Sequence, residues 1–258
     1  MMENYFNDLV LNNDTNFYLG TGNPSSKILI IGKESAIDKI SNYEQYEREI
    51  LNNALDWKKN IEDNIHQDSV TSWFIDYPLY NPLYPYKGQL NKIQNKRTGN
   101  NGGTSRTFYN YQKLLDKIYN ENRKSSNINF HEKCFITELN SSTAKYSHLV
   151  NTIDRKNSIN NRQELLTHPY YQSFPIVLFA VGNYVRDFNI DIQKLFNVKF
   201  DAETGTLPIT KTNYINLHYD DITNPSRLVI HTNQLSINIS DLLLNELSQY
   251  IREHLELI

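Results

Sequence analysis

The chain has 258 residues, of which 39% are hydrophobic, and its 26 lysines and arginines against 29 aspartates and glutamates give a net charge of −3. This length fits one domain spanning residues 1–258, and the negative charge argues against a dedicated nucleic-acid binder, which usually carries a basic excess. The single cysteine, Cys134, excludes an intrachain disulfide and a four-cysteine iron–sulfur site.

No stretch of the sequence has the pattern of a targeting or membrane segment. The first residues lack a signal-peptide pattern, and no apolar run approaches transmembrane length. We therefore expect a cytoplasmic protein without membrane contact, and a monomer.

Strands are expected to alternate with helices along the chain. Apolar runs predict the strands, and apolar residues at helical spacing predict the helices. The expected strands are 27–31, 134–138, 176–182 and 228–230, and the expected helices are 42–60, 105–119, 162–174, 184–196 and one carrying residues 242–251. The segment 198–217 is expected to form an irregular hairpin insert. This alternation favours an α/β fold, a three-layer α/β/α domain around a mainly parallel four-stranded sheet.

The first expected strand breaks at Gly32-Lys-Glu-Ser-Ala36. A glycine directly after a buried strand lets the backbone turn tightly and approach a ligand closely. Lys33 and Glu34 then bring a pair of opposite charges to the end of the strand.

The Tyr77–Tyr86 segment contains three prolines, which keep it extended. Its tyrosines could stack on a nucleobase or pack the loop against the body.

Positive charge gathers around Gly99, Gly102 and Gly103. Glycines bring amide groups close to a phosphate backbone, and cations release counterions from it. Thr104 could cap helix 105–119, whose dipole would favour a phosphate at that end. The alternative is a solvated loop. The cations are Lys87, Lys92, Lys96, Arg97 and Arg106.

The last expected strand stops at His231, and Ser236, Asn238 and Ser240 offer caps for the helix that follows. Ligands of open α/β sheets bind beyond the carboxyl ends of the strands. If the first and last strands are parallel neighbours, His231 and Glu34 face one cleft with Gly32 at its floor. The alternative is a histidine that only ends a strand and bonds a nearby carbonyl.

Four motifs in this order resemble the uracil-DNA glycosylase superfamily. Gly20-Thr-Gly-Asn-Pro24 and the break at Gly32 look like its first motif, and Cys134–Glu138 resembles the strand that ends in a base-reading asparagine. Ile176–Gly182 resembles the next strand. His231-Thr-Asn-Gln-Leu-Ser236 is similar to the closing His-Pro-Ser-Pro-Leu-Ser motif. The resemblance spans roughly residues 18–255.

The resemblance implies a DNA-repair hydrolase that cleaves the N-glycosidic bond of a flipped, damaged or modified base, with no metal or organic cofactor. His231 would stabilise the departing base and Glu34 would hold the water and the sugar cation. Glu138 or Asn140 would read the base. Further implied contacts are Gly32, Ser35, Thr232 and Asn233 on the substrate, and Lys87, Lys92, Arg97, Arg106 and Ser236 on DNA.

Departures from the family pattern at four positions leave other functions open. Glu34 and Ser35 replace the usual Asp or Asn and Pro, and Thr232 replaces a proline. An ionised Glu138 would only accept hydrogen bonds, which suits a base presenting N–H donors, such as guanine or adenine, rather than uracil. The alternatives are a catalytically silent glycosylase-fold protein that binds nucleic acid or a partner protein, and a hydrolase of a free nucleoside or nucleotide.

Overall fold

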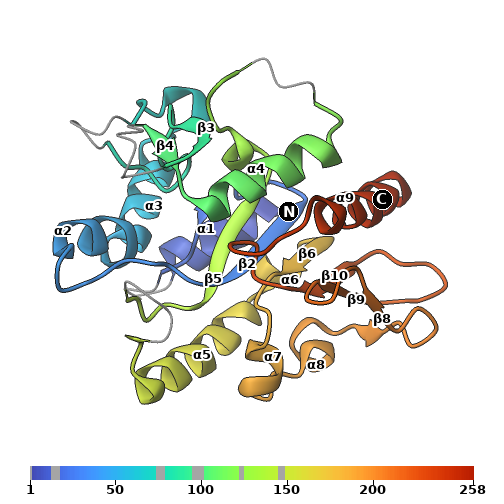
Figure 1. The fold of residues 1–258 in the computed structure, drawn as a ribbon. Coiled ribbons are helices and arrows are strands. Elements are labelled where there is room, and N and C mark those ends of the chain that lie inside the picture. The colour runs from blue at the N-terminus through green and yellow to red at the C-terminus, as the bar shows by residue number, and fades with distance from the viewer. Residues whose placement is uncertain (1, 13–17, 74–78, 95–101, 122–124, 145–148) are drawn as a thin grey trace.

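The computed structural model describes residues 2–12, 18–73, 79–94, 102–121, 125–144 and 149–258. Its centre is a mixed sheet of eight strands in the order β1-β5-β2-β6-β10-β9-β7, with β8 paired to β9. Helices cover both faces of this sheet (Figure 1). The strands are β1 (Thr21–Gly22), β2 (Ile28–Glu34), β5 (Phe135–Asn140), β6 (Ile176–Phe179), β7 (Lys199–Phe200), β8 (Thr206–Pro208), β9 (Tyr214–Tyr219) and β10 (Leu228–Thr232).

Four parallel strands, β5, β2, β6 and β10, occupy the middle of the sheet. Their sequences are nearly continuous apolar runs because both faces of each strand are buried. Ile30 of β2 lies between Ile136 of β5 and Leu178 of β6, and all three are almost fully buried. The carboxyl ends of these four strands therefore meet at one edge of the sheet.

The sheet is mixed and has eight strands, so the expectation of a mainly parallel four-stranded sheet is wrong. β1 pairs antiparallel with β5 at one side, and β9 pairs antiparallel with β10 at the other. The segment 198–217, expected to be an irregular hairpin insert, instead supplies β7, β8 and most of β9. Buried and half-buried residues largely alternate along β9, which is typical of an antiparallel strand with one covered face.

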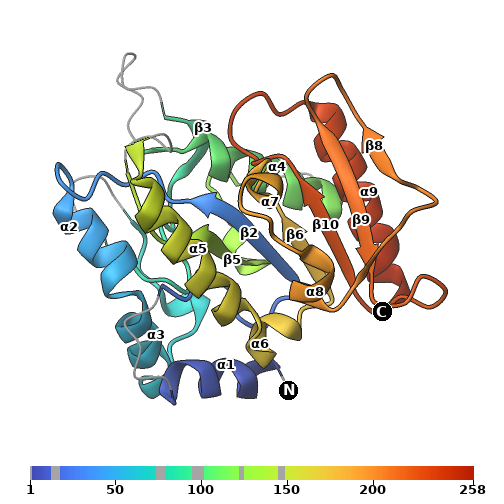
Figure 2. The ribbon, with the colours of Figure 1, turned by 90° about the horizontal axis from the view of Figure 1, so that it is seen from below.

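Two apolar clusters pack the helices against the two faces of the sheet. One joins the sheet to α1, α3, α5, α6 and α8, and the other joins it to α4 and α9. Figure 2 shows α5 and α6 in front of the sheet and α4 behind it. The helices are α1 (Met2–Leu11), α2 (Tyr43–Tyr46), α3 (Asn53–Glu62), α4 (Arg106–Ile118), α5 (Thr152–Leu166), α6 (Pro169–Gln172), α7 (Tyr184–Asp187), α8 (Ile192–Phe196) and α9 (Asp241–Leu257).

Capping side chains explain where several helices differ from the expected ones. α5 begins at Thr152 rather than Arg162, because the Asn151 side chain accepts hydrogen bonds from the first free amides. Ser105, not Thr104, caps α4. Ser240 caps α9. The expected helix 184–196 is two helices, because Asn189 takes a left-handed conformation between them (φ 52°).

Short turns and a small second sheet complete the described structure. A π-helical turn, Glu47–Leu51, joins α2 to α3, and short 3₁₀ turns lie at Gln67–Ser69 and Phe130–Glu132. A separate pair of short strands, β3 (Leu90–Ile93) and β4 (Gly103–Thr104), precedes α4. None of the helices in the described ranges is long and apolar enough to cross a membrane.

Candidate active site at the carboxyl ends of the central strands

Two glutamates lie on neighbouring strands near the carboxyl ends of β2 and β5. The strands pair so that Gly32 lies opposite Glu138 and Glu34 lies opposite Asn140. Among the described residues, Oε1 of Glu34 and Oε2 of Glu138 have no hydrogen-bond partner, although both atoms are buried. Buried polar atoms are nearly always bonded in native proteins, so two unpartnered carboxyl oxygens at this edge indicate a ligand site.

Gly32 makes room for the Glu138 carboxyl group. A Cβ atom placed on Gly32 would overlap Oε2 of Glu138 and lie 3.0 Å from its Cδ. Both the glycine and the glutamate are therefore needed for this arrangement. Gly32 is expected to let a ligand approach the backbone closely. In the structure, the group that approaches it is the side chain of Glu138.

Among the residues that the structure describes, the carboxylate of Glu34 is held through Oε2 alone. Asn140 Nδ2 donates to Oε2 over 3.0 Å, and the Tyr184 hydroxyl donates to the same oxygen. Asn140 is fully buried, and its Oδ1 accepts from the Ser142 amide at 2.9 Å. Since both ends of this amide are engaged, we assign Asn140 to positioning Glu34 rather than to reading a base. Oε1 of Glu34 is left to face a ligand.

Tyr184 is the site residue that the sequence analysis missed. It begins α7, two residues after Gly182, and its ring is almost fully buried. Lys33 Nζ lies 4.3 Å from the centre of this ring, and burial lowers the pKa of Lys33. The sequence signal for Tyr184 is a buried strand followed by a glycine and a short helix. Gly32 also follows a buried apolar run.

Glu138 holds a proton at neutral pH. Burial, reinforced by the Glu34 carboxylate, raises the pKa of Glu138 to about 8, although the Arg162 guanidinium acts in the opposite direction. The premise that Glu138 is ionised is therefore wrong. A protonated carboxyl group donates one hydrogen bond and accepts others, as an amide does.

This proton predicts a pH-dependent stability. The unfolded chain releases the Glu138 proton near pH about 4.3, whereas the folded chain keeps it to pH about 8, so stability is lost as pH rises between these values. We expect Glu138→Gln to be more stable than wild type by about 4–5 kcal/mol at pH about 8 and by little at pH about 4. Urea denaturation of both proteins across this range measures the difference. Parallel stability curves would contradict the assignment.

His231 is not on a strand that neighbours Glu34. β6 lies between β2 and β10, which corrects the expected adjacency, although both residues lie at the same edge of the sheet. His231 Nε2 lies 3.0 Å from the Gly182 carbonyl oxygen and 3.1 Å from the Tyr214 hydroxyl, and Nδ1 lies 3.2 Å from Asn216 Nδ2. Since a carbonyl only accepts, Nε2 carries the proton. Burial lowers the pKa of His231 to about 4, so the ring is neutral at pH 7.

These contacts favour the structural role considered for His231, a bond to a nearby carbonyl. The carbonyl belongs to Gly182, two residues before Tyr184. The ring therefore fastens the turn that presents the Tyr184 hydroxyl to Glu34. We assign His231 to positioning through Tyr184 rather than to direct contact with a ligand.

The loop after β10 is held by its own polar side chains. Thr232 Oγ1 donates to the Tyr214 carbonyl at 2.6 Å, and Asn233 bonds the Tyr214 amide and the Thr212 carbonyl. These bonds explain why neither side chain joins the Glu34–Glu138 pair, so the structure assigns both to the loop.

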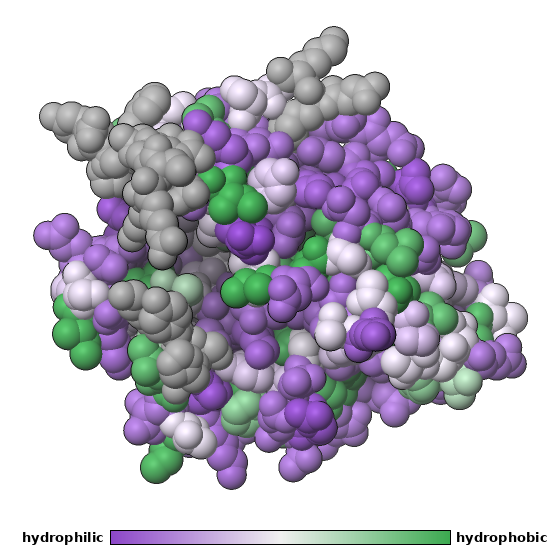
Figure 3. Space-filling model, in the orientation of Figure 1, coloured by the Kyte–Doolittle hydropathy of each residue, from purple (hydrophilic) through white to green (hydrophobic). Residues whose placement is uncertain are grey.

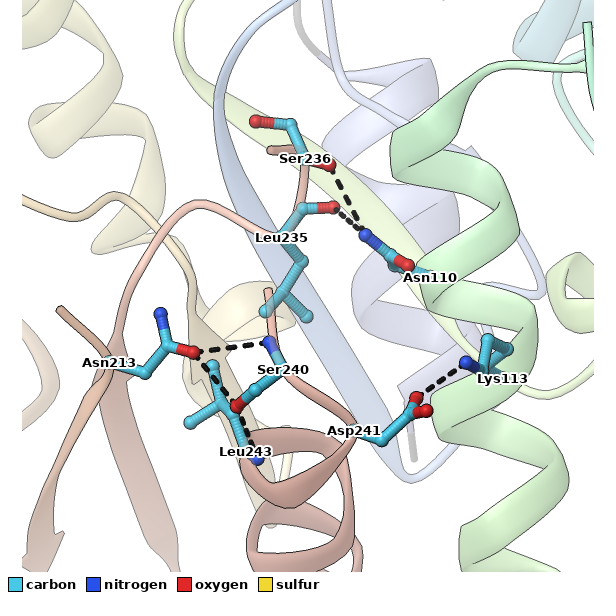
Figure 4. Close-up of polar contacts among 8 residues, drawn as sticks. All are labelled: Asn110, Lys113, Asn213, Leu235, Ser236, Ser240, Asp241 and Leu243. Atoms are coloured by element: carbon cyan, nitrogen blue, oxygen red, sulfur yellow. Dashed lines mark hydrogen bonds and ion pairs between the residues drawn. The ribbon is translucent and has the colours of Figure 1, made fainter. Parts of the chain in front are cut away.

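Figure 4 shows how α4 supports the same loop. Asn110 Nδ2 donates to the carbonyl oxygens of Leu235 and Ser236, each at 3.3 Å. Asn213 accepts from Ser240, and Lys113 pairs with Asp241 at 2.5 Å. The Ser236 hydroxyl points away from Asn110. Ser35 follows Glu34 directly and is half-buried.

The cations expected to contact DNA differ in their exposure and in their hydrogen bonds to the protein. Lys92 on β3 and Arg106 at the start of α4 are exposed, and the pairing of β3 with β4 brings their segments together. Lys87 is half-buried, and its Nζ donates to the Gln67 carbonyl at 3.1 Å. Arg97 and Lys96 lie outside the described residues.

The tyrosines of the proline-rich segment pack against the body of the protein. Tyr84 is buried and its hydroxyl donates to the Ile128 carbonyl, while the Tyr80 and Tyr86 rings lie 5.8 Å apart. Tyr77 lies outside the described residues. Within the described ranges, no three His, Cys, Asp or Glu side chains gather to hold a metal ion.

Comparison of the chain with models of protein families, with curated proteins and with solved structures gives no match.

Proposed function

We propose that the protein is a DNA glycosylase-like hydrolase, built on a three-layer α/β/α fold of the uracil-DNA glycosylase type. The observation that carries the proposal is the placement of two carboxyl groups on neighbouring strands: Glu34 is fixed through Oε2 and, among the described residues, unpartnered at Oε1, and burial raises the pKa of Glu138. Two carboxyl groups with such different environments suit a general acid and a general base at one glycosidic bond. The ordered motifs between residues 18 and 255 support DNA as the substrate.

The two glutamates divide the chemistry. Oε1 of Glu34 accepts a hydrogen bond from water and faces the sugar, where its negative charge stabilises the oxocarbenium-like transition state. Glu138 donates its proton to the departing base, which takes the electron pair of the broken C1′–N bond. The water oxygen bonds to C1′, and Glu34 receives the proton that the water loses. Asn140 and Tyr184 hold Glu34 in place, and His231 holds the turn before Tyr184.

A glycosylase assay tests this proposal. Duplex oligonucleotides carrying uracil, hypoxanthine or alkylated purines are incubated with wild type and with Glu138→Gln, and abasic sites are measured across the pH range. We expect excision of at least one base, with activity falling as pH rises through about 8, where Glu138 loses its proton. Glu138→Gln should lose both the activity and this pH limb.

Two other results would replace the proposal. DNA binding without excision of any base would favour the catalytically silent glycosylase-fold protein. Hydrolysis of free nucleosides without binding to duplex would favour the nucleoside hydrolase.

The face in Figure 3 is largely hydrophilic, with apolar residues in separate small groups. A partner protein usually docks on a contiguous apolar patch, so this face suits a polar ligand better.

Lys92 and Arg106 are the exposed cations that we expect to contact phosphates. The double variant Lys92→Ala, Arg106→Ala should lower affinity for duplex DNA by roughly tenfold at low salt and reduce the salt slope by about 2. Fluorescence anisotropy at several salt concentrations measures both. The matched control, Lys194→Ala with Lys199→Ala, removes two exposed lysines around α8 and β7. An equal loss in the control would show that only net charge matters.

A further inference from the structure

Lys33 lies beside the candidate site and takes no part in the proposed hydrolysis. Because side chains alternate along a strand, it follows Leu29 and Ile31 on the face of β2 that packs with Tyr184. Leu29 and Ile31 are fully buried, whereas Lys33 is half-buried. The lysine side chain therefore leaves the apolar core where β2 ends, at the edge of the sheet that carries Glu34.

Tyr184 contacts both the Lys33 amine and the Glu34 carboxylate. Nζ of Lys33 lies 4.3 Å from the centre of the Tyr184 ring, and the hydroxyl of this ring donates to Oε2 of Glu34. The Lys33 stem also lies against the turn before Tyr184, since a Cβ atom placed on Gly182 would be 3.9 Å from Cε of Lys33. One buried tyrosine therefore holds an amine and a carboxylate at the same edge of the sheet.

The amine of Lys33 is available to a ligand. Within the described ranges, its Nζ forms no hydrogen bond and no ion pair, and its close contact is with the face of the tyrosine ring. Burial lowers the pKa of Lys33 most strongly, and the Arg155 guanidinium of α5 acts in the same direction. The carboxylates of Glu34 on β2 and Asp187 on α7 oppose this shift. Desolvation and a neighbouring cation are conditions that make a lysine amine nucleophilic.

We propose that Lys33 is a nucleophile that forms an imine with C1′ of an abasic sugar in DNA, so that the protein also cleaves the strand at that sugar. The inference rests on the proposed function, because base excision leaves this sugar in the site as its product. The ring-opened sugar is an aldehyde, and lysine amines form imines with carbonyl substrates. Glu34 is the neighbouring base, since its Oε1 has no partner among the residues that the structure describes.

The reaction needs only DNA, water and a proton from solvent. The Lys33 amine adds to the C1′ aldehyde, and the C1′ oxygen takes up the proton and leaves as water, which gives a C1′=N iminium. Oε1 of Glu34 then takes a proton from C2′, and the C2′–H electron pair forms a C1′=C2′ bond while the C1′=N pair moves to nitrogen. The nitrogen lone pair restores the C1′=N bond, the C1′=C2′ pair moves to C2′=C3′, and the C3′–O bond breaks with its electron pair on the phosphate oxygen. Water hydrolyses the iminium and releases Lys33.

Trapping on a preformed abasic site tests this inference without any base excision. A duplex that carries one abasic sugar is incubated with the protein and sodium cyanoborohydride, which reduces an imine to a stable amine. We expect a covalent protein–DNA adduct that peptide mass mapping places on Lys33, and cleavage of the strand on the 3′ side of the sugar when the reductant is omitted. Lys33→Arg keeps the positive charge but forms no imine, so it should lose the adduct. The matched control Lys27→Arg, at an exposed position before the other end of β2, should keep it.

Glu34→Gln separates imine formation from strand cleavage. The variant removes the base that takes the C2′ proton but leaves the amine, so we expect the adduct to form and strand cleavage to slow by at least about a hundredfold. Denaturing gels with and without reductant measure both quantities in the same samples.

The outcomes distinguish this inference from the proposed hydrolase. Absence of an adduct, or an adduct on an amine other than Lys33, would overturn the inference even if the protein excises a base from ordinary DNA. An adduct on Lys33 with an unbroken strand would overturn the elimination step. Trapping on Lys33 and strand cleavage, together with no excision of any base, would support the amine chemistry and reject the hydrolase.

Discussion

Replacing Glu34 with glutamine is expected to lower kcat for base excision by at least about a hundredfold, while binding to intact duplex stays within about twofold. Glutamine keeps the size of the side chain and one acceptor for Asn140 and Tyr184, but it removes the negative charge and the base that accepts the water proton. Single-turnover kinetics together with anisotropy separate the two effects. Glu203→Gln, at an exposed loop position, is the matched control and should retain activity.

Tyr184, which donates a hydrogen bond to Glu34, allows a milder change at the same carboxylate. Tyr184→Phe deletes the hydroxyl that donates to Oε2, but Asn140 still holds the same oxygen. We therefore expect a smaller loss, about tenfold, confined to kcat. Full activity in Glu34→Gln would remove the carboxylate from the mechanism.

The second large effect is expected at Arg162, which stabilises the fold rather than the reaction. Its guanidinium is almost fully buried and donates to the carbonyls of Glu138 and Tyr18 and to Thr137 Oγ1. Arg162→Met keeps the apolar stem and leaves these acceptors without their donor. We expect the free energy of unfolding to fall by about 3–5 kcal/mol, measured by urea denaturation.

Arg186 provides the matched comparison for that measurement. It is exposed on α7 and pairs with its sequence neighbour Asp187. Arg186→Met should change the free energy of unfolding by less than about 0.5 kcal/mol, as expected for a surface ion pair. Similar losses in the two variants would show that the buried bonds of Arg162 add nothing beyond its charge.

The central strands could be predicted because their apolar runs are local signals. Residues 27–31, 134–138, 176–182 and 228–230 overlap β2, β5, β6 and β10. The order of those strands is not a local signal, since nothing in the run at β6 indicates that it separates β2 from β10. The antiparallel strands were missed as part of the sheet because β7 and β8 are short and β9 is only partly apolar.

The candidate site was predicted in part. Glu34 and Glu138 follow from strand ends, which the sequence displays. The proton on Glu138 does not, because it depends on burial and on the charge of Glu34 across the strand pair. Tyr184 was hidden for a related reason: its contact with Glu34 joins two residues far apart in the chain through the turn at Gly182.

Side chains at positions 32 and 138 would compete for the same space. Because the carboxyl group of Glu138 fills the space that a side chain at Gly32 would need, a side chain at position 32 displaces that carboxyl group. A larger residue at 32 therefore favours a shorter one at 138, or moves the acid group away from the sheet edge. Variation at these two positions should therefore be correlated, and a chain with alanine or serine at 32 should have lost the proton donor at 138.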